Sequence, residues 1–197
     1  MKIASHNSWT YLSPKKWYMK PFAKIGRCQE VDIKTQYEKH NVRLFDLRVR
    51  FVNHEPIVVH SAMVYKYTFD NLIKDFNYLN DKQDIFIRII LDLRSYKGSV
   101  ASQVADYNNF YIWCSRVYNN ITFCGGRMLP SWSKVLKECP DIDSEIQEKH
   151  ASVCSPKYID DWYPKYYAKH NNKKNKEQYF NEGLFAKEYL MIDFVNI

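Results

Sequence analysis

Apolar residues along this chain recur at two spacings, every second position in short runs and every third or fourth position in longer ones. Residues 42–51, VRLFDLRVRF, alternate cleanly, so that Asp46 and Arg48 share one face of a predicted strand. Residues 56–60, PIVVH, form a second short strand. Residues 84–94, DIFIRIILDLR, are almost continuously apolar, which is typical of a strand covered on both faces of a parallel sheet. These runs predict a sheet.

Helical spacing separates the predicted strands. Residues 68–79, TFDNLIKDFNYL, place large apolar side chains on one helical face, and Thr68 is suited to cap the helix. Residues 99–118 predict a second helix, followed by a strand at 121–124.

The last third of the chain is less regular. A helix is expected near 131–138, and the most basic run, 169–178, is expected to be a solvated loop or the start of a helix. The composition of 176–189 is helical, and 189–195, YLMIDFV, resembles a strand. No repeat or linker divides the chain, so we expect one domain over 1–197. Strands alternating with helices favour an α/β fold, either an open doubly wound sheet or a closed barrel.

Composition adds a preference for anionic partners. The formal net charge is +7, which suits nucleic acid, an acidic membrane surface or a phosphorylated small molecule. No recognised nucleic-acid module carries a basic stripe with aromatic residues, so nucleic acid is not expected as a partner. We expect a monomer.

Cysteine usage and hydropathy bear on the compartment. The five cysteines lack CxxC or Cys/His ligand spacing, so neither a disulfide framework nor a zinc site is indicated, and reduced thiols are expected. No apolar run is long enough to span a bilayer. A cytoplasmic protein is expected for the sequence as it stands, or a secreted one if a signal peptide has been removed.

Titratable residues lie in or just after the apolar strands. Burying a charge there costs stability unless the group is paired, so such residues are candidates for ion pairs or for a functional site. Singly, each has an ordinary explanation, such as a polar loop residue or a structural ion pair. Together, two histidines, an arginine and carboxylates suit phosphodiester cleavage, which needs a base, an acid and a fixed cation for the phosphorane charge. In a barrel, strand ends meet on one face, so these residues would become neighbours: His6, Asp46, Arg48, His60, Asp92 and Asp193.

Four segments carry a family resemblance. SHNSWTYL, VRLFDLRVR, PIVVHSAMVYKYTFDNLI and LMIDFV are similar, in this order, to the catalytic strands of the phosphatidylinositol-specific phospholipase C X-domain superfamily, especially its bacterial branch. The resemblance covers roughly residues 1 to 95 and resumes at the last strand. It implies a (β/α)8 barrel of the TIM type. Since such barrels typically need about 250 residues, we expect a compact or incomplete one.

The resemblance implies a role for each matching residue. His6 matches the general base that activates the inositol 2-hydroxyl, and Asp193 matches the carboxylate that orients this base. Arg48 matches the arginine that contacts the phosphate, Asp46 its orienting partner, and His60 the general acid for the leaving diacylglycerol. The implied products are diacylglycerol and a cyclic inositol phosphate, released from phosphatidylinositol or from glycosyl-inositol anchors at a transiently bound membrane surface.

Metal dependence is the first open point. Asn7, Asp46 and Asp92 could offer oxygen ligands to calcium, as in the calcium-dependent branch of the family. The fixed charge of Arg48 at the same place would repel a divalent ion, so we expect metal-independent chemistry with no cofactor, and calcium is the alternative.

Substrate contacts and activity are the other open points. By weaker matches, Arg127 would contact phosphate or inositol, Asp160 would bind ring hydroxyls and Trp162 would stack on the ring. Asn7 and Asp92 would lie among these substrate contacts. Two alternatives remain: a catalytically silent module that binds phosphate or membrane, and a phosphodiesterase for another head group such as glycerol.

Overall fold

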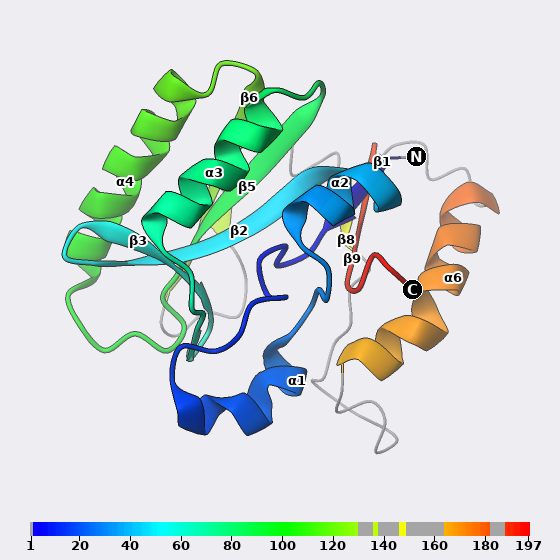
Figure 1. Ribbon diagram of the computed structural model, residues 1–197, viewed down its shortest axis with the longest axis horizontal. Helices are drawn as coiled ribbons and strands as arrows, with labels where there is room; N and C mark the ends of the chain where they lie inside the picture. Colours follow the sequence, from blue (N-terminus) through cyan, green and yellow to red (C-terminus); the bar gives the residue numbers. More distant parts are fainter. Residues whose placement is uncertain (1, 130–135, 138–145, 149–163, 182–187) are drawn as a thin grey trace.

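In a computed structural model the chain folds around one curved sheet (Figure 1). The structure describes residues 2–129, 136–137, 146–148, 164–181 and 188–197. The strand order is β7-β6-β5-β2-β1-β9-β8, and a hairpin of β3 and β4 is attached to β2. The strands are β1 Lys2–Ser5, β2 Val42–Val52, β3 Glu55–His60, β4 Met63–Val64, β5 Ile85–Asp92, β6 Ile121–Met128, β7 Leu136–Lys137, β8 Ile146–Glu148 and β9 Tyr189–Ile192.

Most neighbouring strands of this sheet run parallel. β2 pairs in parallel with both β1 and β5, and β9 pairs in parallel with β1 and β8. β3 and β7 are antiparallel to β2 and β6. The carboxyl ends of β1, β2, β5 and β9 therefore point the same way, which brings the residues that follow these strands to one edge of the sheet.

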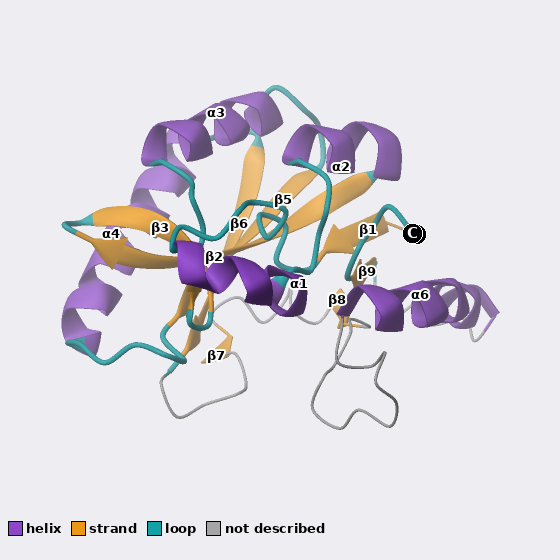
Figure 2. Ribbon diagram, turned by 60° about the horizontal axis from the view of Figure 1, so that its bottom comes forward, coloured by secondary structure: helices purple, strands orange, loops and turns teal. Residues whose placement is uncertain are grey.

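Figure 2 shows α2 and α3 above the strands, α1 in front of them and α6 to the right, near β8 and β9. Side chains at the caps begin three of the helices: Asp32, Thr68 and Ser99 each accept a hydrogen bond from a backbone N–H in the first turn. The helices are η1 Trp17–Phe22, α1 Ala23–Gly26, α2 Ile33–His40, α3 Phe69–Asn80, α4 Val100–Val117 and α6 Pro164–Asn181.

The two faces of β2 carry different kinds of side chain, because successive side chains point to opposite sides of a strand. Phe45, Leu47 and Val49 face α3 and α4 and belong to the large apolar core. Leu44 belongs to a smaller cluster on the opposite face, with Ala4, Tyr189 and Met191. Asp46 and Arg48 share this second face, so their charges lie inside the curve of the sheet.

The structure confirms the α/β class and most of the predicted elements. Thr68 caps α3 as expected, and the apolar run at 84–94 is a parallel strand buried on both faces. The basic run 169–178 lies within α6. None of the described helices combines the length and apolarity needed to cross a membrane.

Three predictions need correction. Residues 136–137, expected in a helix, pair with β6 as strand β7, and the rest of that predicted helix lies outside the described residues. The last strand ends at Ile192 rather than 195, because the chain turns at Asp193 and Phe194 has a positive φ of 49°. A closed barrel is not seen: among the described strands, β7 and β8 end the strand order without pairing to each other.

Candidate active site

The site is built where β1 and β9 end side by side. Ser5 is the register partner of Ile192, so the next residues, His6 and Asp193, leave the sheet together. The backbone N–H of His6 still donates to the Ile192 carbonyl, at 3.1 Å. As a result, His6 Nδ1 lies 2.7 Å from Asp193 Oδ1, although the two residues are 187 positions apart.

Arg48 defines the tautomer of His6. Its Nη2 lies 2.8 Å from His6 Nε2, and a guanidinium group can only donate, so Nε2 is the acceptor in this bond. The ring proton of neutral His6 is then on Nδ1, where it donates to Asp193. Asp193 therefore orients an imidazole whose lone pair on Nε2 points toward Arg48.

Asp46 holds Arg48 in place. Its Oδ2 accepts from Arg48 Nε at 3.3 Å and from the backbone N–H of Asn7 at 3.0 Å, and its Oδ1 accepts from Arg88 Nε at 3.0 Å. Burial by itself would raise the pKa of the Asp46 carboxyl, but the charges of Arg88 and Arg48 outweigh burial and hold it well below its usual range. Asp46 is thus a permanent anion beside the base, with Oδ2 4.0 Å from His6 Nε2.

His60 comes to the site because β3 folds back along β2. Val58 pairs with Val49, so the antiparallel register carries His60 back toward the level of Arg48. Its Nδ1 donates to the Gly26 carbonyl at 2.8 Å, which leaves Nε2 for other partners. Burial, followed by the charge of Arg48, lowers the pKa of His60 to about 4. His60 is therefore neutral near pH 7 unless a negative charge joins it.

Asp92 anchors the turn that follows His60. Its carboxylate accepts from Arg94 Nε at 3.0 Å, from Arg94 Nη2 at 2.6 Å and from the backbone N–H of Ser61 at 2.9 Å. Ser61 has a positive φ of 53°, so this bond holds a strained turn. Burial opposes ionisation of Asp92, but the hydrogen bond and charge of Arg94 prevail and hold its pKa well below its usual range.

Asn7 links the base to a buried thiol. Its Nδ2 lies 3.2 Å from His6 Nε2 and 3.4 Å from Cys28 Sγ. Its Oδ1 is buried and has no hydrogen-bond partner among the described residues. Asn7 also has a positive φ of 46°, which turns the chain directly after His6.

The structure thus brings His6, Asn7, Asp46, Arg48 and Asp193 into direct contact, with His60 close to Arg48. Asp92 lies one step away, behind Ser61 and Arg94. Arg127 is elsewhere: it faces α4, with its guanidinium 5.9 Å from the Tyr107 ring centre and 3.5 Å from Asn108 Oδ1. Asp160 and Trp162 lie outside the described residues.

Sequence reasoning did not single out Arg88 or Cys28. Arg88 is a lone charge in the apolar run of β5 and pairs in register with Asp46, so a buried cation in a strand was a usable signal. Cys28 gave no such signal, because it lies in a loop and reaches the site only through tertiary contacts. Of the described His, Cys, Asp and Glu residues, only His6, Cys28 and Asp193 gather closely enough to hold a metal ion.

Comparisons with known proteins define the class of fold. No protein family model matches the sequence, and no curated protein matches it. Among solved structures, the chain is similar to the phosphatidylinositol-specific phospholipase C from Listeria monocytogenes, with a TM-score of 0.63 and 10% identity. The match covers 98% of this chain and 87% of that one. At this identity the likeness shows a shared fold.

Proposed function

We propose that this protein is a phosphodiesterase that cleaves phosphatidylinositol-type lipids, or glycosyl-inositol anchors, into diacylglycerol and a cyclic inositol phosphate. The observation that supports it best is the setting of His6: Arg48 and Asp193 together define its tautomer, and its Nε2 lone pair accepts from Arg48. A base beside a fixed cation suits attack of a hydroxyl on a phosphodiester. The fold shared with a phospholipase C supports the same class of reaction.

The reaction divides between the two histidines. His6 Nε2 accepts the proton of the inositol 2-hydroxyl as that oxygen forms a bond to phosphorus. Arg48 leaves His6 and binds the non-bridging oxygens, where negative charge grows. Protonated His60 donates its proton to the diacylglycerol oxygen as the bond from phosphorus to that oxygen breaks. Water then opens the cyclic phosphate with the proton roles reversed.

His60 must be protonated to act as the acid, and binding of the anionic substrate favours its protonation. In the free protein, burial and the charge of Arg48 depress the pKa of His60 to about 4. A bound phosphodiester anion would pair with Arg48 and set a negative charge near His60, which raises that pKa again. The acid is thus charged only when substrate is present.

Metal-free chemistry is part of the proposal. The carboxylate oxygens of Asp46 and Asp92, which calcium would need, already accept from Arg48, Arg88 and Arg94. Recruiting calcium would require breaking these buried ion pairs, and Arg48 already supplies positive charge at the phosphate position.

An exposed aromatic segment supports a lipid surface as the transient partner of a monomeric protein. Trp17 is 79% exposed on η1, and Tyr18, Phe22 and Ile25 are also exposed. Aromatic side chains of this kind are favoured at lipid interfaces. The segment runs directly into Gly26, whose carbonyl accepts from His60, so lipid would be held near the proposed acid.

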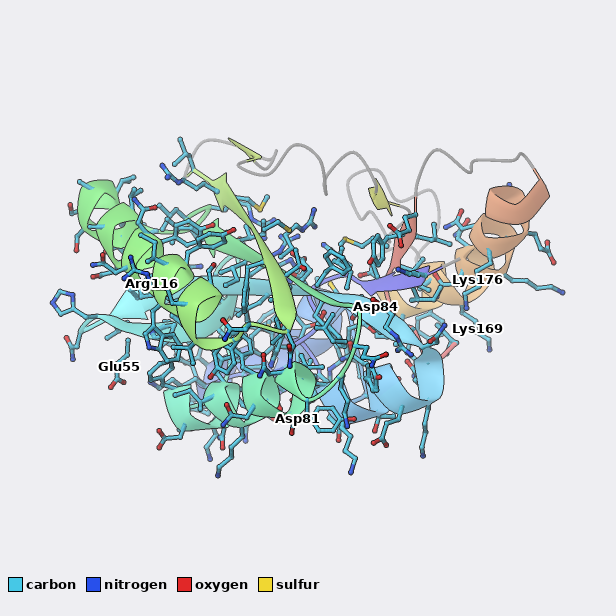
Figure 3. All side chains as sticks on the ribbon, turned by 90° about the horizontal axis from the view of Figure 1, so that it is seen from above. Glu55, Asp81, Asp84, Arg116, Lys169 and Lys176 are labelled. Atoms are coloured by element: carbon cyan, nitrogen blue, oxygen red, sulfur yellow. The ribbon has the colours of Figure 1, made fainter. Side chains whose placement is uncertain are left out.

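Basic residues extend this surface from α1 to α6. A cavity of about 310 Å³ lies between the two helices, and Figure 3 shows Lys169 and Lys176 along α6. Such a surface attracts anionic lipid head groups. The cavity is lined by Lys24, Arg27, Glu30, Lys165, Tyr166, Lys169 and Phe194.

The test is product formation from phosphatidylinositol and from a glycerophosphodiester, each with and without a strong calcium chelator. We expect a cyclic inositol phosphate, formed equally well with chelator. His6→Ala and His60→Ala should each lower turnover by about 10²–10⁴-fold. His54→Ala is the matched control, because His54 also pairs with an aspartate, Asp106, but lies on the β2–β3 turn. Cleavage of the glycerol substrate alone, dependence on calcium, or full activity of His6→Ala would each contradict the proposal.

A further inference from the structure

A buried thiol completes a set of metal-binding groups behind the base. His6, Cys28 and Asp193 each offer one ligand atom, and these atoms lie within 4.8 Å of one another. All three residues are buried, with exposed fractions of 6%, 4% and 1%. The group includes a nitrogen, a sulfur and an oxygen donor.

The backbone holds Cys28 next to Asp193. The Cys28 carbonyl accepts from the backbone N–H of Phe194 at 2.6 Å. The Gln29 side chain then bridges the end of β9, donating to the Ile192 carbonyl at 3.1 Å and accepting from the N–H of Val195 at 3.0 Å. Backbone and side-chain hydrogen bonds to the end of β9 therefore hold the Cys28 thiol beside His6 and Asp193.

We infer that His6, Cys28 and Asp193 form an inhibitory site for a soft divalent cation, with Zn²⁺ as the best match. Thiolate, imidazole and carboxylate are the ligands that zinc takes in proteins, in a tetrahedron with metal–ligand distances of about 2.0–2.3 Å. To surround an ion, the His6–Asp193 contact of 2.7 Å has to open and ligand pairs near the 4.8 Å limit have to close. Calcium would not fit, because it takes oxygen ligands.

The ion would bind on the side of His6 that faces away from Arg48. Its place is between Nδ1 and Asp193, whereas Arg48 and the substrate position lie at Nε2. The guanidinium therefore does not occupy the metal position. On binding, the thiol of Cys28 releases its proton to solvent, and the ring proton of His6 moves from Nδ1 to Nε2. Arg48 Nη2 can only donate, so it loses its acceptor on His6 and turns away from the ring.

This shift of the ring proton removes the base. A neutral imidazole that coordinates an ion through Nδ1 carries its hydrogen on Nε2, which can no longer accept a proton from a hydroxyl. Binding of the ion and catalysis therefore exclude each other. The inhibition rests on the proposed function, whereas the binding of the ion does not.

Asn7 gives a second, independent observation. Its Oδ1 is buried without a partner among the described residues, while Nδ2 lies 3.2 Å from His6 Nε2. A buried unpaired acceptor is costly. When Nε2 carries the proton, rotation of the amide by half a turn lets Oδ1 accept it. The metal-bound tautomer thus satisfies an atom that the metal-free protein leaves unpaired.

Binding is tested first, without reference to activity. The full-length protein is titrated with Co²⁺, a spectroscopic substitute for Zn²⁺, and then with Zn²⁺ in competition with a chromogenic chelator. Wild type and Cys114→Ser should bind one ion and show the sulfur-to-cobalt charge-transfer band, because Cys114 is a buried free thiol on α4, away from the site. Cys28→Ser should lose the band and bind at least about tenfold more weakly. Asp193→Asn should also weaken binding.

Inhibition is tested next, as turnover at increasing free Zn²⁺. The turnover of wild type and of Cys114→Ser should fall more than about tenfold at saturating Zn²⁺ and recover when chelator is added. The turnover of Cys28→Ser should stay at the rate that this variant has without metal. Binding without any turnover would overturn the proposed function and leave the site intact. A wild-type protein that binds no Co²⁺, or binds it without the band, would overturn the site. If Cys28→Ser does not fold, X-ray absorption of the zinc-loaded wild type decides, because absence of a sulfur ligand would refute the inference.

Discussion

Arg48 contacts groups from three different parts of the site. Its Nη2 contacts the base, its Nε contacts Asp46, and its Nη1 lies 3.4 Å from Met128 Sδ on β6. The guanidinium is thus held by residues on β2 and β6 and by His6, which directly follows β1. A planar, permanently charged fork can bind two phosphate oxygens at once, which a lysine ammonium cannot do.

We therefore expect Arg48→Lys to lower turnover by about 10²–10³-fold, the usual loss for one donor to a transition-state anion. Steady-state cleavage of phosphatidylinositol measures it. Arg43→Lys is the control, because Arg43 is also on β2 but stacks on the Tyr37 ring, 4.2 Å from its centre. Turnover of Arg48→Lys within a few-fold of wild type would show that a point charge suffices there.

His60 allows a test through stability. Because burial and then Arg48 lower the pKa of His60 from 6.5 to about 4, the unfolded chain binds its proton at higher pH than the folded chain does. Between pH 6.5 and 4 the free energy of unfolding should therefore fall as pH falls, by at most about 1.4 kcal/mol per pH unit from this group. Above pH 6.5 its contribution is constant.

Urea denaturation of wild type and His60→Gln at several pH values measures this contribution, because glutamine keeps a polar side chain but does not titrate in this range. The difference in stability between the two should shrink as pH falls through the window. A difference that stays constant from pH 7 to 4 would mean that His60 has an ordinary pKa in the folded protein.

At the scale of elements, the short segment formed by η1 and α1 differs from the other helices. None of its residues from Trp17 to Gly26 is buried, and its exposed aromatic and basic side chains lie beside each other. The remaining described helices bury a face against the sheet or against one another. Packing inside the molecule therefore does not explain the exposed aromatic side chains of this segment, whereas the lipid contact proposed above would explain them.

The double variant Trp17→Ala with Phe22→Ala should bind phosphatidylinositol-containing vesicles at least about tenfold more weakly, since each large apolar side chain contributes about 1.5–3 kcal/mol when buried. Vesicle sedimentation measures the loss. Ile112→Ala is the control, because Ile112 is an exposed apolar residue on α4. Turnover of a short-chain, monomeric substrate should be unchanged in both. Equal vesicle binding by the double variant would exclude this segment as the lipid contact.

At the scale of the whole molecule, Arg88 and Asp46 join the sheet from within. Arg88 on β5 is 2% exposed, bonds Asp46 on β2 through Nε and places Nη2 3.2 Å from Met191 Sδ on β9. Burying an ion pair costs free energy, because both charged groups must lose their contact with water. Arg88 thus connects β5 with β2 and with β9, which is two strands from β2 in the sheet.

We expect Arg88→Met to lower the free energy of unfolding by about 3–5 kcal/mol, since it leaves the Asp46 carboxylate buried with less compensation. Chemical denaturation measures it. Arg116→Met, on the exposed face of α4 and visible at the surface in Figure 3, should change stability by no more than about 0.5 kcal/mol. Unchanged or increased stability of Arg88→Met would show that a well-packed apolar side chain replaces the ion pair.

Local pattern was enough to predict those features that depend on near neighbours in the chain. The two-residue period of 42–51 and the apolar run of 84–94 predicted β2 and β5, and Thr68 predicted the start of α3. Charged residues at strand ends singled out His6, Asp46, Arg48, His60 and Asp193, because a titratable group in an apolar strand needs a partner wherever the strand goes.

Which of these residues contact one another was decided only by the tertiary structure. Such contacts depend on strand order, register and face, and local periodicity does not contain this information. Parallel pairing of β1 with β9 joins His6 to Asp193, and the fold-back of β3 brings His60 to Arg48. The same alternation that turns Met128 toward Arg48 turns its neighbour Arg127 toward α4, away from Arg48. Cys28 lies beside His6 because hydrogen bonds connect its loop to the end of β9, 166 positions further along the chain. The sequence of a loop carries no local signal for such a distant connection.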